Sequence, residues 1–77
     1  MHADTLVRMV NDISQFFAPA SPEAEAAADV AGHITRSWDP RMRRQIIEIW
    51  QAGHGDFSPV GRAAIAILAA AAARKAG

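Results

Sequence analysis

The residues that could do chemistry gather between His33 and Arg44. These twelve positions hold four of the eight basic residues, all arginines, and one of the two tryptophans. Guanidinium groups make forked hydrogen bonds to carboxylates and stack on aromatic rings, so arginine beside tryptophan favours a protein interface. We therefore predict a protein-binding segment with six candidate contact residues: His33, Arg36, Trp38, Arg41, Arg43 and Arg44.

Groups for nucleophilic or metal chemistry are scarce by comparison. The chain has no cysteine and no tyrosine, and Lys75 lies near its end. The three histidines are scattered, and no pair has the spacing of a metal-binding motif. Ser21, Ser37 and Ser58 stand at predicted helix ends, where their hydroxyls have structural uses. We expect no catalytic residue, no cofactor and no metal site in this chain.

Helix-start signals place the segment at a junction between two helices. Ser21-Pro22, Asp39-Pro40 and Ser58-Pro59 each put a capping residue before a proline, whose fixed φ suits the first helical turn. A fourth start lies near Asp4 or Thr5. With the spacing of apolar residues, these signals predict helices over residues 4–18, 22–37, 40–52 and 59–74. We predict an all-α fold, a small bundle of three to four short helices.

The apolar faces indicate how these helices pack. Phe16 and Phe17 complete the apolar arc of the first helix, so we expect that helix to supply most of the aromatic core. The last helix is rich in alanine, so we expect it to dock most weakly. The chain is expected to form a single helical domain over residues 1–77, with residues 69–77 fraying.

The arginines of the third predicted helix stand at unusual positions. Cations in the first turn of a helix oppose its dipole by some tenths of a kcal/mol each. Three arginines there indicate a use beyond solvation. Arg44 can pair with Glu48 one turn later, whereas Arg43 borders the apolar side that carries Ile47 and Trp50.

Size and charge exclude several classes of protein. Eight acidic and eight basic residues give a formal net charge of zero, so no overall field draws the chain to nucleic acid or an anionic membrane. No apolar run reaches the roughly 18 residues of a membrane span, and the N-terminus lacks the pattern of a secretion signal. A chain of 77 residues has a small margin of stability, which favours a partner. We expect a cytoplasmic protein that binds neither nucleic acid nor membrane.

Three segments resemble a known family. They are Leu6-Val7-Arg8-Met9-Val10-Asn11, Phe16-Phe17, and His33-Ile34 followed by Trp38-Asp39-Pro40-Arg41-Met42-Arg43. Over about residues 6–64 the chain resembles the delta subunit of soluble NAD-dependent, molybdenum-containing formate dehydrogenases. It departs from that pattern at Ser37, where the family has an aromatic residue, and at Val10, where it has alanine. The tail from residue 69 carries no resemblance.

The resemblance implies a non-catalytic accessory subunit. Such a subunit would contact the catalytic alpha subunit and assist its assembly, its cofactor-competent state or its stability. The resemblance also implies that the larger subunits carry molybdopterin, iron–sulfur clusters, FMN and NAD. No family-defined catalytic residue carries over to this chain.

Other hypotheses remain open at this point. A small helix-turn-helix-like regulator would place the third helix in a groove of nucleic acid, although the neutral charge argues against it. The arginines could instead contact the phosphates of the pterin cofactor during its insertion. An independent structural oligomer is a further possibility.

Overall fold

Four α-helices and one 3-10 turn account for most of the residues that the structure describes. The computed structural model describes the backbone of residues 2–76 and the side chains of residues 2–75. The elements are α1 (Ala3–Phe17), η1 (Ala18–Ala20), α2 (Glu23–Ser37), α3 (Pro40–Gln51) and α4 (Pro59–Ala76). The predicted all-α bundle is confirmed, with helix bounds within two residues of those expected. Met1 and Gly77 of the predicted single domain lie outside the described residues.

The predicted proline starts are confirmed for α3 and α4. α3 begins at Pro40, and the Asp39 side chain accepts a 3.0 Å hydrogen bond from the Met42 amide. α4 begins one residue after Ser58, whose hydroxyl accepts a 3.1 Å hydrogen bond from the Gly61 amide. Each cap satisfies an amide that has no partner within its own helix.

α2 begins differently from the expectation. Pro22 is the residue before the first helical turn, and no side chain caps this end, so the capping role expected of Ser21 is wrong. Glu23 and Glu25 stand in the first turn instead. Their negative charges complement the positive end of the helix dipole.

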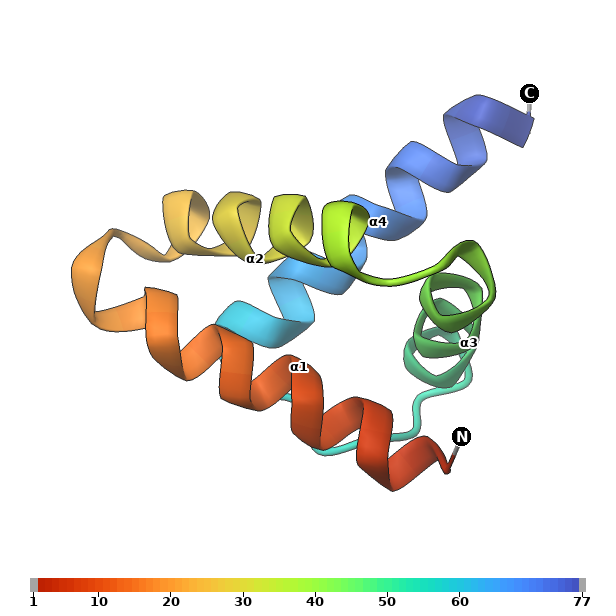
Figure 1. Ribbon diagram of the computed structural model, residues 1–77, viewed down its shortest axis with the longest axis horizontal. Helices are drawn as coiled ribbons and strands as arrows, with labels where there is room; N and C mark the ends of the chain where they lie inside the picture. Colours follow the sequence, from red (N-terminus) through yellow and green to blue (C-terminus); the bar gives the residue numbers. More distant parts are fainter. Residues whose placement is uncertain (1, 77) are drawn as a thin grey trace.

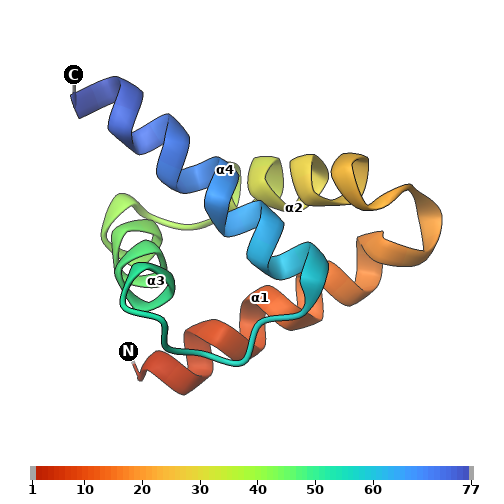
Figure 2. The ribbon, with the colours of Figure 1, turned by 180° about the vertical axis from the view of Figure 1, so that it is seen from behind.

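The helices form a hairpin with two further elements around it. α1 and α2 are the arms, joined by η1, and α3 stands at the open end of the hairpin (Figure 1). α4 begins beside α1 on the other side and crosses α2, and its last turns project beyond α2 (Figure 2). No helix among the described residues is long and apolar enough to cross a membrane.

The expectation that α4 docks most weakly is wrong for its first half. α4 and α2 have the most extensive contact of any pair of helices. Ala64 and Ile65 are fully buried, and Leu68 is nearly so. Alanines are buried on both helices, including Ala27 and Ala31 of α2. Small side chains let two helix backbones approach closely, so a helix poor in large residues still packs well. Beyond Leu68 none of the described residues is buried.

The expectation that α1 supplies most of the aromatic core is also wrong. Phe16 is 78% exposed, whereas Trp38 and Phe57 are 5% and 6% exposed. They come from the α2–α3 junction and the loop before α4. A wide apolar arc does not show which of its borders faces the core. In α1 the border of the arc that carries Val7 and Ser14 faces the core, and both residues are buried.

The loop between α3 and α4 is fixed at both ends. α3 ends in a Schellman arrangement, with Gly53 at a φ of 78° and the His54 amide donating to the Ile49 carbonyl at 3.0 Å. Glycine after the last helical turn is thus a local sequence signal for the end of α3. Farther along, the Asn11 side chain of α1 donates to the Asp56 carbonyl at 2.9 Å and accepts from the Ser58 amide at 2.9 Å. The loop therefore enters α4 along a defined path.

Candidate protein-binding surface

The described residues offer little for catalysis. Among them no group of three histidine, cysteine, aspartate or glutamate side chains could hold a metal ion. The Ser58 hydroxyl is used as a helix cap, and that of Ser14 is buried and donates to the Val10 carbonyl at 2.7 Å.

Basic side chains gather at one end of the fold, which we call the basic end. The last turn of α2, the whole of α3 and the last turn of α4 lie on the same side of the molecule (Figure 1). These elements and their junction also carry Asp39 and Glu48, fewer acidic than basic residues. The first turn of α2, with Glu23 and Glu25, lies at the opposite end. The zero net charge of the chain therefore hides a separation of charge. The basic residues of the basic end are Arg36, Arg41, Arg43, Arg44, Arg74 and Lys75.

Arg43 fastens α3 to the end of α2. Its Nη1 donates to the carbonyl of Trp38 at 2.7 Å and to that of Thr35 at 3.2 Å. Carbonyls in the last turn of a helix lack helical partners and carry its negative pole, so a guanidinium there is favourable. The side chain is half-buried. The sequence pattern did not predict this positioning role of Arg43. The available signal was its place one helical turn after the two-residue junction between the helices.

Trp38 belongs to the core. It lies at the C-terminal end of α2 with extended backbone angles, φ −95° and ψ 142°, and its amide donates to the Ile34 carbonyl at 2.9 Å. Only 5% of its surface is exposed. The ring therefore holds the junction between α2 and α3 in place from inside the molecule.

His33 faces α1 rather than α3. Its ring centroid lies 6.3 Å from that of Phe17, and the side chain is half-buried. Phe17 in turn meets Phe16 edge to face, at 5.2 Å between centroids. The structure thus separates His33, which joins an aromatic cluster with α1, from the arginines of α3.

Three arginines of the predicted set are exposed: Arg36, Arg41 and Arg44. The guanidinium of Arg36 folds back over Gly32, where a Cβ atom would lie 3.2 Å from its Nη1. Arg41 and Arg44 extend from the first turns of α3. The fold therefore leaves these three side chains accessible to a partner at the basic end.

A groove runs between α3 and α4 at the basic end. Its volume is about 780 Å³, and its lining includes Arg43 and Arg44. Ile47, Leu68 and Lys75 also line it and were missed by the sequence analysis. No local pattern could reveal them, because the tail of α4 meets α3 only through the tertiary fold. A second groove, of about 670 Å³, lies beside Asn11 and Phe57.

Comparison with known protein families gives one finding. Residues 5–65 match the family of the NADH-dependent formate dehydrogenase delta subunit, FdsD. The match runs from α1 into the first half of α4 and includes all six predicted contact residues. Comparisons with curated proteins and with solved structures gave no match.

Proposed function

The chain belongs to the delta subunit family of NADH-dependent formate dehydrogenases, and we propose that it is a non-catalytic accessory subunit of such an enzyme. The family match over residues 5–65 carries this proposal. The exposed arginines of the basic end support it, since guanidinium groups offer a surface that suits a protein partner. The comparisons lend no support to a helix-turn-helix regulator.

The proposed partner is the catalytic alpha subunit. We propose that the chain binds it through the basic end, with Arg36, Arg41 and Arg44 contacting carboxylates of the partner. Guanidinium forks match carboxylate geometry, and charge complementarity speeds the encounter of two proteins. Trp38 and Arg43 would act from behind the surface by holding the α2–α3 junction, and His33 would lie at its edge.

The proposed effect is on the stability of the partner. A protein that binds the native form of another and not its unfolded form shifts the folding equilibrium of that partner toward the native state. Binding by this chain would thus favour an alpha subunit able to receive and keep its cofactors. In this proposal molybdopterin, iron–sulfur clusters, FMN and NAD all reside in the larger subunits, and this chain holds none of them.

The first test is to produce the enzyme complex with and without this chain. We expect the alpha subunit made without it to have lower molybdenum content and lower formate oxidation per alpha subunit. We also expect both to be restored when the chain is supplied. Equal molybdenum content and equal activity in the two preparations would contradict an accessory role.

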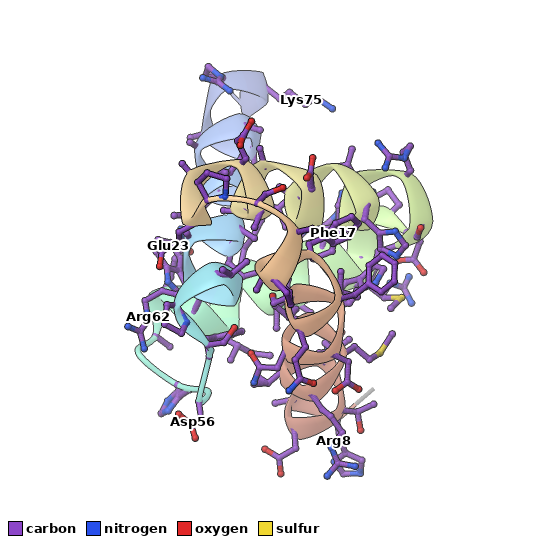
Figure 3. The ribbon with its side chains drawn as sticks, turned by 90° about the vertical axis from the view of Figure 1, so that its left-hand side faces the viewer. Arg8, Phe17, Glu23, Asp56, Arg62 and Lys75 are labelled. Atoms are coloured by element: carbon purple, nitrogen blue, oxygen red, sulfur yellow. The ribbon has the colours of Figure 1, made fainter. Side chains whose placement is uncertain are left out.

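The second test concerns the surface. The double variant Arg41→Glu/Arg44→Glu should no longer co-purify with the alpha subunit, because two attractive charges become repulsive. Arg62→Glu is the control, since Arg62 is exposed on α4 and lies well away from Lys75 of the basic end (Figure 3). Circular dichroism of each purified variant checks that its helices are intact. Retention of the double variant at the level of the control would rule out the basic end as the binding surface.

A further inference from the structure

The buried face of α4 continues past the body of the molecule. Ala64 and Leu68 face the core. The helical repeat places Ala71, Ala72 and Lys75 on the continuation of the same face. Ala71 is half-buried, and Ala72 and Lys75 are exposed. The last turns of α4 project beyond α2 (Figure 2). The face that packs on α2 in the first half of α4 therefore has no described helix to pack on in the second half.

This exposed continuation forms one wall of the groove of about 780 Å³, and α3 forms the other. The α3 wall extends from Pro40 to Gln51, the full length of that helix, and Ile47 lies along it. A wall of twelve residues is about 18 Å long at 1.5 Å per residue, or roughly three helical turns. Ile47 and Leu68 add larger apolar side chains to the lining.

The shape of the groove suits a third helix. The α4 wall is made mostly of alanine, including Ala69 and Ala72. Such a wall allows another helix backbone to approach to the short end of the usual 8–10 Å range. α2 and α4 already pack in this way, with alanines buried on both helices. A helix in the groove would therefore repeat a packing mode that this fold uses elsewhere.

The charge of the groove favours an acidic occupant. Arg43, Arg44 and Lys75 line it, against the single carboxylate of Glu48. Carboxylates of an occupant would thus meet attractive charge from Arg43 and Arg44 in the N-terminal half of α3 and from Lys75 of α4.

We propose that the groove between α3 and α4 binds an acidic α-helical segment of the partner subunit. Apolar residues of that segment would cover Ile47 and Ala72, and its carboxylates would face Arg44 and Lys75. The inference rests on the proposed function and goes beyond it. The family match ends at residue 65, whereas the α4 residues that line the groove begin at Leu68. The α4 wall of the groove therefore lies outside the part of the chain that matches the family.

A second copy of this chain fits the groove less well. Its acidic helix face is on α2, where Glu25 and Asp29 are exposed beside Ala24 and Ala28. Alanine side chains alone would leave the space above Ile47 unfilled, and unfilled apolar space forgoes packing energy. The occupant needs larger apolar residues beside its carboxylates.

A matched pair of substitutions on α4 tests the groove. Ala72→Trp places an indole inside it, whereas Ala70→Trp places the same side chain on an exposed position of the same helix that does not line the groove. We expect Ala72→Trp to weaken binding to the co-produced alpha subunit by about tenfold or more and Ala70→Trp to leave it unchanged. Equal binding by both variants would overturn the inference. Failure of the unsubstituted chain to bind would instead overturn the proposed function.

A crosslinking experiment identifies the occupant. A photo-crosslinking amino acid at position 72 of the chain in the assembled complex is expected to capture one segment of the alpha subunit. Mass spectrometry of the crosslinked peptide should show an acidic sequence with helical spacing of its apolar residues. Crosslinks between two copies of this chain, crosslinks to a basic or non-helical segment, or the absence of crosslinks in a complex that forms would each overturn the inference.

Discussion

The Arg43 guanidinium lies 2.7 Å from the carbonyl oxygen of Trp38, so a charged side chain of α3 closes the end of α2. The two residues between the helices, Trp38 and Asp39, both have extended backbone angles, and no glycine is needed at this junction. Asp39 caps α3 from one side of the junction and Arg43 caps α2 from the other. The junction that presents the exposed arginines is thus itself held by an arginine.

Arg43→Ala should therefore lower the free energy of unfolding by about 1–2 kcal/mol. Hydrogen bonds to a charged group contribute about 1.5–3 kcal/mol, and the partial exposure of this site reduces that value. Urea unfolding followed by circular dichroism measures the change. Arg41→Ala, at an exposed position two residues earlier, should stay within about 0.5 kcal/mol. Similar losses in the two variants would show that Arg43 has no special role in the junction.

The cap at Asp39 and the glycine stop at Gly53 could be predicted from the sequence because both depend on neighbouring residues. A carboxylate three residues before an amide, or a glycine after the last helical turn, makes its bond with little help from the rest of the fold. The contacts of Arg43 were harder to predict. They require a two-residue junction of defined geometry, which the sequence pattern leaves open.

Which residues of α1 are buried, and how closely α4 packs on α2, depend on the tertiary fold and could not be predicted from the sequence pattern. An apolar arc on α1 was predicted, but the choice between the border with Phe16 and the border with Ser14 depends on where α2 and α4 lie. The alanines of α4 predict weak docking because each small side chain buries little apolar surface. In the fold they allow close contact with α2. The groove that includes Lys75 arises from the same long-range arrangement.

The two phenylalanines Phe16 and Phe57 should respond very differently to truncation. Phe57→Ala removes a ring that is 6% exposed and should cost about 3–5 kcal/mol, because a cavity remains in the core. Phe16→Ala removes a ring that is 78% exposed and loses mainly its edge-to-face contact with Phe17, about 0.5–1.5 kcal/mol at most. Thermal unfolding of both variants tests the difference. A larger loss for Phe16→Ala would contradict the burial of Phe57.

The two glycines of the α3–α4 loop form a second matched pair. Both have positive φ, 78° at Gly53 and 89° at Gly55, so alanine at either position is strained by about 1–2 kcal/mol. At Gly55 the added Cβ would also lie 2.7 Å from the Phe57 ring and 3.0 Å from Val7, whereas at Gly53 it meets nothing within 4 Å. Gly55→Ala should therefore cost about 1–3 kcal/mol more than Gly53→Ala. Equal urea unfolding midpoints for the two variants would contradict the close contact of Gly55 with Phe57 and Val7.

Asn11 offers a test of how the loop is held. Asn11→Ala removes two hydrogen bonds, to the Asp56 carbonyl and from the Ser58 amide, and should lower stability by about 1–2 kcal/mol. Asn11→Asp keeps the acceptor for Ser58 and loses the donor to Asp56. Amide hydrogen exchange should therefore speed up at Ser58 in Asn11→Ala and stay slow in Asn11→Asp. Gln15→Ala, at an exposed position of α1, is the control and should leave that amide unchanged.

Hydrogen exchange along α4 tests both the predicted fraying and the proposed groove. In the free chain, amides of residues 71–76 should exchange through local openings of about 1–2 kcal/mol, because beyond Leu68 no described residue is buried. The amides of Ile65 and Leu68 should approach the free energy of global unfolding. In the complex with the alpha subunit, residues 71–75 should become protected because an occupant helix would cover their face. A tail as protected as Ile65 in the free chain would contradict the fraying, and unchanged exchange in the complex would contradict the groove as a binding site.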